Sequence, residues 1–235
     1  MTMKPLLLTM GDPCGIGPEI VLDALCGADA ALVVGHVGVM RRAMALRAEA
    51  GRWPLAVLES PADWAQCPPR CVAVWEPPGL PDGLAHLPWG HVDARAGAAA
   101  ARCIEAAVEA LQRGEGLALV TAPVHKEALA AAGVPYPGHT EMLQALAARG
   151  GTVPPVRMML ANDEIRVVLV TIHMALRVAI DAVTFDAVLE TLRITHAAAA
   201  RWGQPRPRIG VAGLNPHAGE GGLFGDEELR VIGPA

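Results

Sequence analysis

The sequence predicts an α/β protein built around a largely parallel β-sheet. Three observations support this fold class: apolar runs of strand length recur along the chain, helical stretches fall between several of them, and 52% of the 235 residues are hydrophobic. A chain of this length and composition can bury one large core or two modest ones. Strands that alternate with helices are typical of parallel sheets, because the helix carries the chain back to where the next strand begins.

The expected strands are short apolar segments between polar or turn-forming residues. In chain order they are Leu6 to Thr9, Ala31 to Val34, Val72 to Trp75, Leu117 to Thr121, Ile165 to Thr171 and Ile209 to Leu214. One pair departs from the parallel pattern. The apolar runs 156–160 and 165–170 are joined through Asn162 and Asp163, which favour a tight turn, so we expect a β-hairpin there and a mixed sheet overall.

The clearest predicted helix runs from Ala94 to Arg113, where apolar residues recur at helical spacing. Thr140 and Thr184 stand where N-caps belong, and the helices that follow them are expected to end at Gly150 and Gly203. These helices separate the strands and complete the α/β pattern.

Local composition suggests two lobes. The stretch from Pro135 to Gly138 is a candidate hinge, because Pro and Gly interrupt regular structure. We therefore place the first α/β lobe at residues 1–135 and the second at residues 136–235.

Composition argues against several classes of protein. No apolar run approaches the roughly 20 residues that span a bilayer, and the N-terminus lacks the features of a signal peptide, so we expect a soluble, cytoplasmic protein. A net charge of -5 without a long basic run argues against nucleic-acid binding. The five cysteines are scattered and are expected to be free thiols rather than zinc ligands. The expected partner is a small molecule.

A Gly-rich loop and a lysine follow two of the expected strands. The loop from Gly11 to Glu19 opens a helix with Pro18 at its first position, and its backbone can approach a ligand closely. It lacks the spacing of a G-x-G-x-x-G dinucleotide site, so a ligand-free loop explains it equally well. Lys126 is either a substrate-binding cation or an ordinary exposed lysine at a helix start.

Three histidines each lie at the carboxyl end of an expected strand: His125, His173 and His217. Ligands bind at this edge of open α/β sheets, so we expect the three imidazoles to converge on one site. The alternative for each is that it satisfies loop carbonyls. His217 is the strongest candidate ligand, because the segment from Asn215 to Gly222 is too rich in Gly and polar groups to fill a core.

The segment from Gly138 to Glu141 opens another expected helix and contains His139 and Thr140. A helix N-terminus offers unpaired N–H groups and a positive dipole to a phosphate or carboxylate. An ordinary capped helix start would explain Thr140 but not His139. We therefore expect both residues to bind an anionic substrate.

Taken in order, these motifs resemble one enzyme family. The segments 11–19, 123–126, 138–141, 171–173 and 215–222 together resemble 4-hydroxythreonine-4-phosphate dehydrogenases across all 235 residues. The resemblance implies a two-lobed fold like that of isocitrate and isopropylmalate dehydrogenases, a homodimer with the active site at the dimer interface, NAD or NADP, and a divalent metal such as Zn, Mg or Co. It also implies oxidation of 4-phosphooxy-L-threonine to a β-keto acid that decarboxylates to 3-amino-2-oxopropyl phosphate, in pyridoxal 5'-phosphate biosynthesis.

The resemblance also assigns roles to particular residues. His173 and His217 match two of the family's three metal-binding histidines, and His139 and Thr140 match positions that contact the phosphorylated substrate. It makes the first lobe nucleotide-associated and gives the second lobe the metal, substrate and dimer contacts.

The general base of the implied reaction stays open. Lys126, Asp12 and a water on the metal could each accept the hydroxyl proton while hydride passes to nicotinamide. Nothing in the sequence distinguishes one of them.

Departures from the family pattern leave alternatives. The sequence stops at Ala235, ahead of the stretch in which the family carries its third metal histidine, so one alternative is a truncated, non-catalytic chain. The residues 174–176 stand where the family often has a Pro, which favours a relative acting on another substrate, such as threonate phosphate or a terephthalate-type dihydrodiol. A further alternative is a metal-dependent hydrolase that uses His125, His173 and His217.

Overall fold

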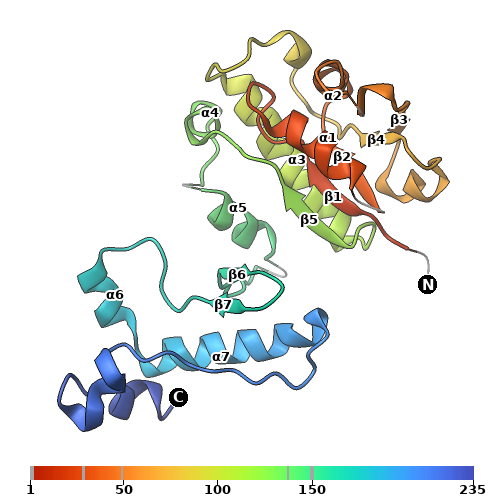
Figure 1. Cartoon of the computed structure of the whole chain (residues 1–235). Coiled ribbons are helices and arrows are strands. Elements are labelled where there is room, and N and C mark those ends of the chain that lie inside the picture. Colours follow the sequence, from red (N-terminus) through yellow and green to blue (C-terminus); the bar gives the residue numbers. More distant parts are fainter. Residues whose placement is uncertain (1–2, 28–29, 49, 137, 149–150) are drawn as a thin grey trace. The chain divides into compact units, whose positions relative to one another are not determined.

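The computed structural model describes residues 3–27, 30–48, 50–136, 138–148 and 151–235, and its chain divides into two compact units (Figure 1). Unit 1 comprises residues 1–154 and unit 2 comprises residues 155–235. The expected lobe boundary after residue 135 falls inside unit 1, and the assignment of functions to two lobes divided there stays a prediction. Pro137 of the candidate hinge lies outside the described residues.

Unit 1 is built on a five-stranded parallel sheet with the strand order β3-β4-β2-β1-β5. Its strands are β1 (Leu6–Thr9), β2 (Ala31–Val34), β3 (Leu55–Leu58), β4 (Val72–Trp75) and β5 (Ala118–Thr121). The expected bounds of β1, β2 and β4 are confirmed, and β5 begins one residue later than expected. β3 was not predicted from the sequence; it is a partly exposed edge strand that pairs only with β4 among the described strands.

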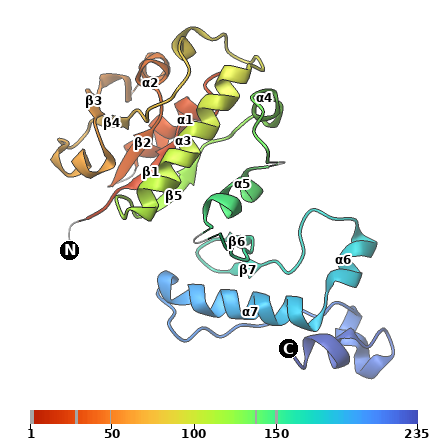
Figure 2. The ribbon, with the colours of Figure 1, turned by 180° about the vertical axis from the view of Figure 1, so that it is seen from behind.

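Helices cover both faces of this sheet. The α-helices of unit 1 are α1 (Gly17–Cys26), α2 (Val37–Met44), α3 (Ala94–Gln112), α4 (Lys126–Ala131) and α5 (His139–Leu146), and the 3₁₀ helices are η1 (Ala50–Arg52), η2 (Pro61–Gln66) and η3 (Leu84–His86). In Figure 1 α1 lies in front of the sheet, and in Figure 2 α3 does, so the two helices pack on opposite faces. The predicted helix over residues 94–113 is thus confirmed as α3, and Asp93 caps it by accepting a hydrogen bond from the Arg95 N–H at 2.8 Å.

Two expected helix starts need correction. α1 begins at Gly17, so Pro18 occupies its second position rather than its first. α5 begins at His139 with Gly138 as its N-cap, which places Thr140 inside the first turn instead of at the cap. Gly138 adopts an extended backbone with no Cβ, and a Cβ there would lie 2.7 Å from a Glu141 carboxylate oxygen. α5 ends at Leu146, and Gly150, the expected stop, lies outside the described residues.

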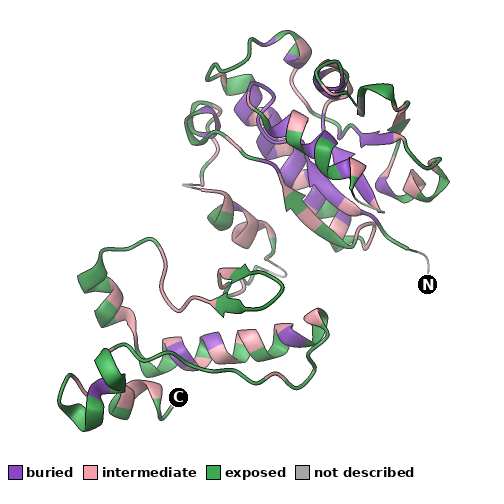
Figure 3. Ribbon diagram, in the orientation of Figure 1, coloured by how far each residue is buried: buried purple, intermediate pink, exposed green. Residues whose placement is uncertain are grey.

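The main core of unit 1 lies between the sheet and its helices, as the buried residues in Figure 3 show. Strand residues such as Leu7, Leu32 and Val33 have no exposed surface, because β1 and β2 are central strands covered on both faces. A second, smaller cluster joins α3, α4 and α5: Ala100, Ala101, Ile104, Leu129 and Met142. This second cluster packs α5 against α3 and α4.

The described part of unit 2 contains a β-hairpin and two α-helices. The strands β6 (Met159–Ala161) and β7 (Arg166–Val168) are antiparallel, which confirms the predicted hairpin. The hairpin forms a two-stranded sheet of its own, so the expected mixed sheet is wrong for the described strands: the five-stranded sheet is parallel throughout. The helices of unit 2 are α6 (Leu176–Ala182), α7 (Phe185–Ala199), η4 (Ala200–Trp202), η5 (Pro216–Gly222) and η6 (Glu228–Ile232).

One predicted strand of unit 2 does not form. Residues 209–214 have no regular secondary structure and pair with no described strand, and all six are exposed. An apolar run becomes a strand only when a neighbour accepts its backbone hydrogen bonds, and none does so here. By contrast, the N-cap prediction at Thr184 is confirmed, since its hydroxyl accepts from the Ala187 N–H at 3.2 Å, and Gly203 ends the helical run with a left-handed backbone.

No helix in the described part of the chain is long and apolar enough to cross a membrane. Cys14, Cys67, Cys71 and Cys103 are free thiols, in agreement with the sequence expectation.

Candidate active site

The Gly-rich loop after β1 is held against the segment after β5, both at the carboxyl edge of the parallel sheet. The Asp12 N–H donates to the Pro123 carbonyl at 3.0 Å, and Gly11 has a left-handed backbone with φ 72°. A Cβ on Gly11 would lie only 2.5 Å from the Pro123 oxygen. This close approach requires glycine at position 11, and it brings the loop next to the segment that carries His125 and Lys126.

The carboxylate of Asp12 faces inward rather than toward solvent. Asp12 is 6% exposed, and its Oδ1 accepts the Cys14 N–H at 2.8 Å. Burial, followed by the nearby Asp12 carboxylate, raises the pKa of the Cys14 thiol, so this thiol stays protonated. Asp12 therefore shapes the turn as well as being a candidate base.

The side chain of Arg42 on α2 binds the backbone of the same loop. This role was not predicted from the sequence. Its guanidinium donates to the Pro13 carbonyl at 2.7 Å and to the carbonyls of Ala85 and Leu87 at 2.9 and 2.6 Å. It also stacks 3.8 Å above the Trp89 ring centroid. No sequence motif marks this arginine, because its partners are backbone carbonyls far along the chain.

His125 and Lys126 lie at the carboxyl end of β5, where they were expected. His125 is the N-cap of α4 without a side-chain capping bond, and both side chains are exposed. They are therefore accessible to a ligand at the sheet edge. The expected convergence of His125 with His173 and His217 would join residues of both units and stays a prediction.

His139 and Thr140 at the start of α5 differ in how exposed they are. His139 is half-buried, and its Nε2 is buried without a hydrogen-bond partner in the described structure. Burial lowers the pKa of this imidazole, so the ring is held neutral near pH 7. Thr140 is exposed in the first turn. A buried polar atom without a partner costs free energy, and a bound ligand that pairs with it would remove that cost.

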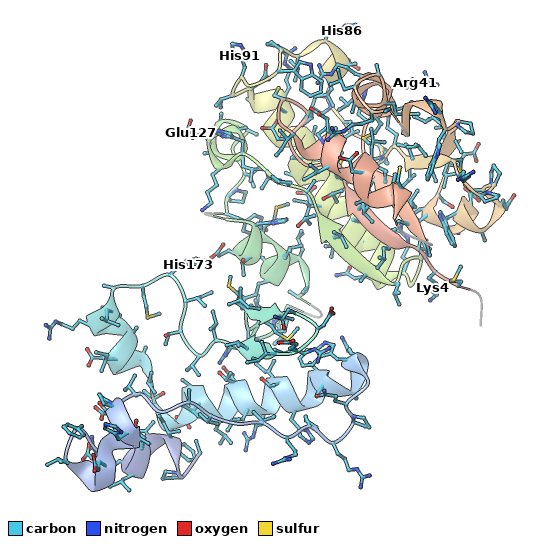
Figure 4. The ribbon with its side chains drawn as sticks, in the orientation of Figure 1. Lys4, Arg41, His86, His91, Glu127 and His173 are labelled. Carbon is cyan, nitrogen blue, oxygen red and sulfur yellow. The ribbon has the colours of Figure 1, made fainter. Side chains whose placement is uncertain are left out.

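His173 and His217 share an unusual backbone conformation. Both have left-handed φ values, 50° and 51°, which non-glycine residues rarely adopt. Both side chains are exposed, and Figure 4 labels His173 on the segment between β7 and α6. Strained backbone of this kind tends to accumulate at functional sites.

The loop that carries His217 is fixed by η6. The carboxylate of Glu228 accepts the N–H groups of Leu214 and Asn215, both at 2.7 Å, and the Asn215 side-chain amide at 3.0 Å. The Asn215 amide is the largest cause that lowers the pKa of Glu228, to about 2. The His217 ring lies 6.1 Å from the Phe224 ring, centroid to centroid.

Comparison with known proteins identifies the family. Residues 28–235 match the model of the family described as pyridoxal phosphate biosynthetic protein PdxA. The chain belongs to the PdxA family. Its relatives are dehydrogenases, so the PdxA chain is an oxidoreductase by family.

Two curated relatives and one solved structure illustrate the similarity of this PdxA chain to known enzymes. A 4-hydroxythreonine-4-phosphate dehydrogenase of Beijerinckia indica subsp. indica is 47% identical, over 100% of this chain and 68% of the relative. A D-threonate 4-phosphate dehydrogenase of Pectobacterium atrosepticum is 42% identical, over 99% of this chain and 70% of the relative. The crystal structure of a 4-hydroxythreonine-4-phosphate dehydrogenase from Klebsiella pneumoniae superposes with a TM-score of 0.86 at 38% identity, covering 99% of this chain and 69% of that one.

The donor chemistry of the PdxA chain fits a divalent metal only in part. His173 and His217 are exposed imidazoles, and neutral imidazole nitrogen is a common ligand of zinc and related ions. No three His, Cys, Asp or Glu side chains gather closely enough to hold a metal ion within the described residues. Since catalytic sites usually draw three protein ligands, His173 and His217 alone do not complete such a site.

Proposed function

We propose that this PdxA-family dehydrogenase oxidises the secondary alcohol of 4-phosphooxy-L-threonine, with NAD or NADP as hydride acceptor, in pyridoxal 5'-phosphate biosynthesis. The observation that carries the proposal is the start of α5, where a helix N-terminus stands beside a neutral, half-buried imidazole with an unpartnered Nε2. The names of relatives such as that of Beijerinckia indica support the substrate.

The start of α5 suits the binding of a phosphorylated substrate. The free N–H groups of the first turn and the helix dipole favour an anion, and the Thr140 hydroxyl can donate a further hydrogen bond. A neutral His139 can donate or accept one hydrogen bond at Nε2, according to its tautomer, which orients the substrate. The second core cluster holds α5 against α3 and α4, so the binding groups are preorganised.

The reaction itself requires removal of one hydride and one proton. Hydride passes from the carbinol carbon to the nicotinamide ring, and the hydroxyl proton passes to a base, which leaves a ketone β to the carboxylate. The C–C bond to that carboxylate then breaks, carbon dioxide leaves, and the ketone carbonyl accepts the electron pair; protonation of the carbon gives 3-amino-2-oxopropyl phosphate. Lys126, Asp12 and bound water remain the candidates for the base.

We also propose His173 and His217 as two of the ligands of a divalent cation, Zn, Mg or Co. Their exposure and their left-handed backbone support the assignment. Such a cation would supply Lewis-acid stabilisation of negative charge on the substrate oxygen. Because two imidazoles do not complete a site, we propose that it is completed in a homodimer whose active site lies at the interface.

The nicotinamide cofactor is proposed to associate with the first lobe, at the carboxyl edge of the parallel sheet. The close packing of the Gly11 loop on Pro123 at that edge supports this location, because ligands of open α/β sheets bind there. A cytoplasmic location is part of the proposal, since free thiols such as Cys14 and Cys67 suit a reducing compartment.

D-threonate 4-phosphate is the second candidate substrate, because a relative at 42% identity is named for it. The two substrates share a phosphate and a secondary alcohol, and they differ in an amino against a hydroxyl group. The same α5 site would hold the phosphate of either one.

A substrate panel on the purified chain tests the proposal. We expect NAD(P)H formation and carbon dioxide release with 4-phosphooxy-L-threonine and a divalent metal. His139→Asn is expected to raise KM at least tenfold, because a hydrogen bond to a charged group contributes about 1.5–3 kcal/mol. His196→Asn is the matched control, since His196 is exposed on α7. Preference for D-threonate 4-phosphate would favour the second candidate, and no turnover with either substrate would contradict both.

A further inference from the structure

Glu228, the first residue of η6, connects this helix to the loop that carries His217 through hydrogen bonds. One carboxylate oxygen accepts two consecutive backbone N–H groups, those of Leu214 and Asn215, at 2.7 Å each. The other oxygen accepts the Asn215 side-chain amide at 3.0 Å. Both carboxylate oxygens are therefore used at the point where the chain enters the loop.

The loop beyond this point follows an uncommon backbone path. Five consecutive residues, 217–221, have φ between 42° and 76° and lie in the left-handed region. Such a run is unfavourable for residues with a Cβ and needs support from its surroundings. Local sequence does not supply that support, because His217, Ala218 and Glu220 are not glycines.

The same carboxylate also limits the middle of the loop. Gly219 is buried, and a Cβ there would lie 3.0 Å from the second Glu228 oxygen and 2.5 Å from the Gly225 carbonyl. Farther along, the Phe224 N–H donates to the Gly219 carbonyl at 3.1 Å, and the Phe224 ring lies beside His217. Glu228 thus contacts the entrance of the loop and packs under its centre.

We propose that Glu228 is the positioning residue for His217: its carboxylate holds residues 214–219 so that the imidazole is presented in one fixed orientation. The functional meaning rests on the proposed role of His217 as a metal ligand, whereas the positioning itself does not. The neighbouring acidic residues cannot replace it. The Glu227 carboxylate accepts the Asn215 side-chain amide at 2.6 Å but no backbone N–H of the loop in the described structure, and Asp226 pairs with Arg230 at 2.8 Å.

The test compares Glu228→Ala and Glu228→Gln with the controls Glu227→Gln and Asp226→Asn in the full chain. The readout is the NMR resonance of the His217 ring Hε1 proton, assigned by its loss in His217→Gln, in metal-free protein. We expect the Phe224 ring, 6.1 Å from the His217 ring, to shift this resonance from its unstructured value. We expect Glu228→Ala to move it to the unstructured value while the resonances of His173 and His196 stay, Glu228→Gln to move it part of the way, and both controls to leave it unchanged.

Three results would decide the matter differently. An unmoved His217 resonance in Glu228→Ala would overturn the proposal. If Glu228→Ala moves the resonances of His173 and His196 as well, unit 2 has lost its fold in that variant. Glu228→Gln is then the deciding variant. If it does not shift the His217 resonance, the proposal is overturned. Equal shifts in Asp226→Asn would also overturn it, since any loss of negative charge on η6 would then suffice.

Titration with Co²⁺ alone, followed by its visible absorption, separates this inference from the proposed function. We expect His217→Gln to abolish Co²⁺ binding and Glu228→Ala to weaken it at least tenfold. If His217→Gln leaves Co²⁺ binding intact, the proposed ligand role fails while the resonance still decides positioning. If His217→Gln abolishes binding but Glu228→Ala leaves it unchanged, the positioning inference fails while the ligand role stands.

Discussion

Single residues decide the close approaches around the candidate site. Gly11 combines a left-handed backbone with a contact that leaves no room for a Cβ, and Gly133 has the left-handed backbone, φ 74°, with nothing near it. Substitution of Gly133 therefore measures backbone strain alone, whereas substitution of Gly11 measures backbone strain together with a steric clash. Their comparison gives the first prediction at this scale.

Gly133→Ala is expected to lower the free energy of unfolding by about 1–2 kcal/mol, the usual cost of a left-handed alanine. Gly11→Ala is expected to lower it by about 3 kcal/mol or more, because overpacking against the Pro123 carbonyl adds to the same strain. Urea titrations of the two variants measure the difference. Equal losses would show that the loop moves away from Pro123 at no cost.

The thiol of Cys67 gives a prediction of pH dependence. Burial, followed by the Cys71 thiol, raises its pKa from 9.0 to about 11. Since the thiolate is the nucleophile, the rate of alkylation by iodoacetamide should rise about tenfold per pH unit from pH 7 and level off only near pH 11. Cys67→Ser identifies the contribution of this residue in peptide maps. A plateau at pH 9 in the folded chain would contradict the raised pKa.

The raised pKa of Cys67 also determines how the free energy of unfolding changes with pH. The folded chain disfavours the Cys67 thiolate, so the unfolded chain loses its proton first as pH rises. The contribution of the protonated Cys67 thiol to the free energy of unfolding is present below pH 9.0 and is lost between pH 9.0 and about 11. The free energy of unfolding of the wild type should therefore fall more steeply across this window than that of Cys67→Ser.

At the scale of elements, the sequence predicted those features that depend on interactions between residues close together in the chain. Thr184 caps the start of α7, Gly203 ends the helical run of α7 and η4, and the β6–β7 hairpin follows from its turn. There the Asn162 side-chain oxygen accepts the N–H groups of Glu164 and Ile165 at 2.9 and 2.7 Å. Thr140 was misplaced because a glycine before it takes the cap position.

Thr184→Ala tests the cap of α7. Loss of the hydrogen bond to the Ala187 N–H should lower the free energy of unfolding by about 1 kcal/mol. Thr195→Ala is the control, because Thr195 lies inside the same helix and its hydroxyl donates to the Thr191 carbonyl behind it. That change should be close to neutral, since alanine is the better helix former. A loss in Thr195→Ala as large as in Thr184→Ala would argue against a specific cap effect.

At the scale of the whole molecule, the two units differ in how much they bury. Unit 1 contains both apolar clusters, whereas only Val188, Thr191, Ala199 and Gly219 are buried among the described residues of unit 2. Unit 2 also contains a cavity of about 600 Å³, bordered by the hairpin, α7 and residues 204–212. Sparse burial of this kind corresponds to low local stability.

Limited proteolysis should therefore attack unit 2 first. We expect trypsin to cleave at exposed arginines such as Arg177 and Arg201 well before it cleaves at Arg52 or Arg70 in unit 1. Mass spectrometry of the digest should show a resistant fragment close to residues 1–154. Simultaneous loss of both units would indicate one cooperative structure instead of two.

The sequence by itself determined the α/β class, three strands to the residue, the long helix α3 and the hairpin. It also determined family membership, because several separate motifs had to occur in one order. These features depend on local periodicity, caps and turns, which are encoded within a few residues. The placement of His139 and Thr140 at a helix start was predicted in the same way.

Only the tertiary structure decided the remaining features. It placed the hairpin in a sheet of its own, left residues 209–214 without a strand partner, and added β3 at the sheet edge. It also showed Arg42 and Glu228 bound to backbone groups of distant loops. The physical reason is common to all of these: backbone hydrogen bonds and close approaches depend on which segments meet in space, and local composition carries no record of that.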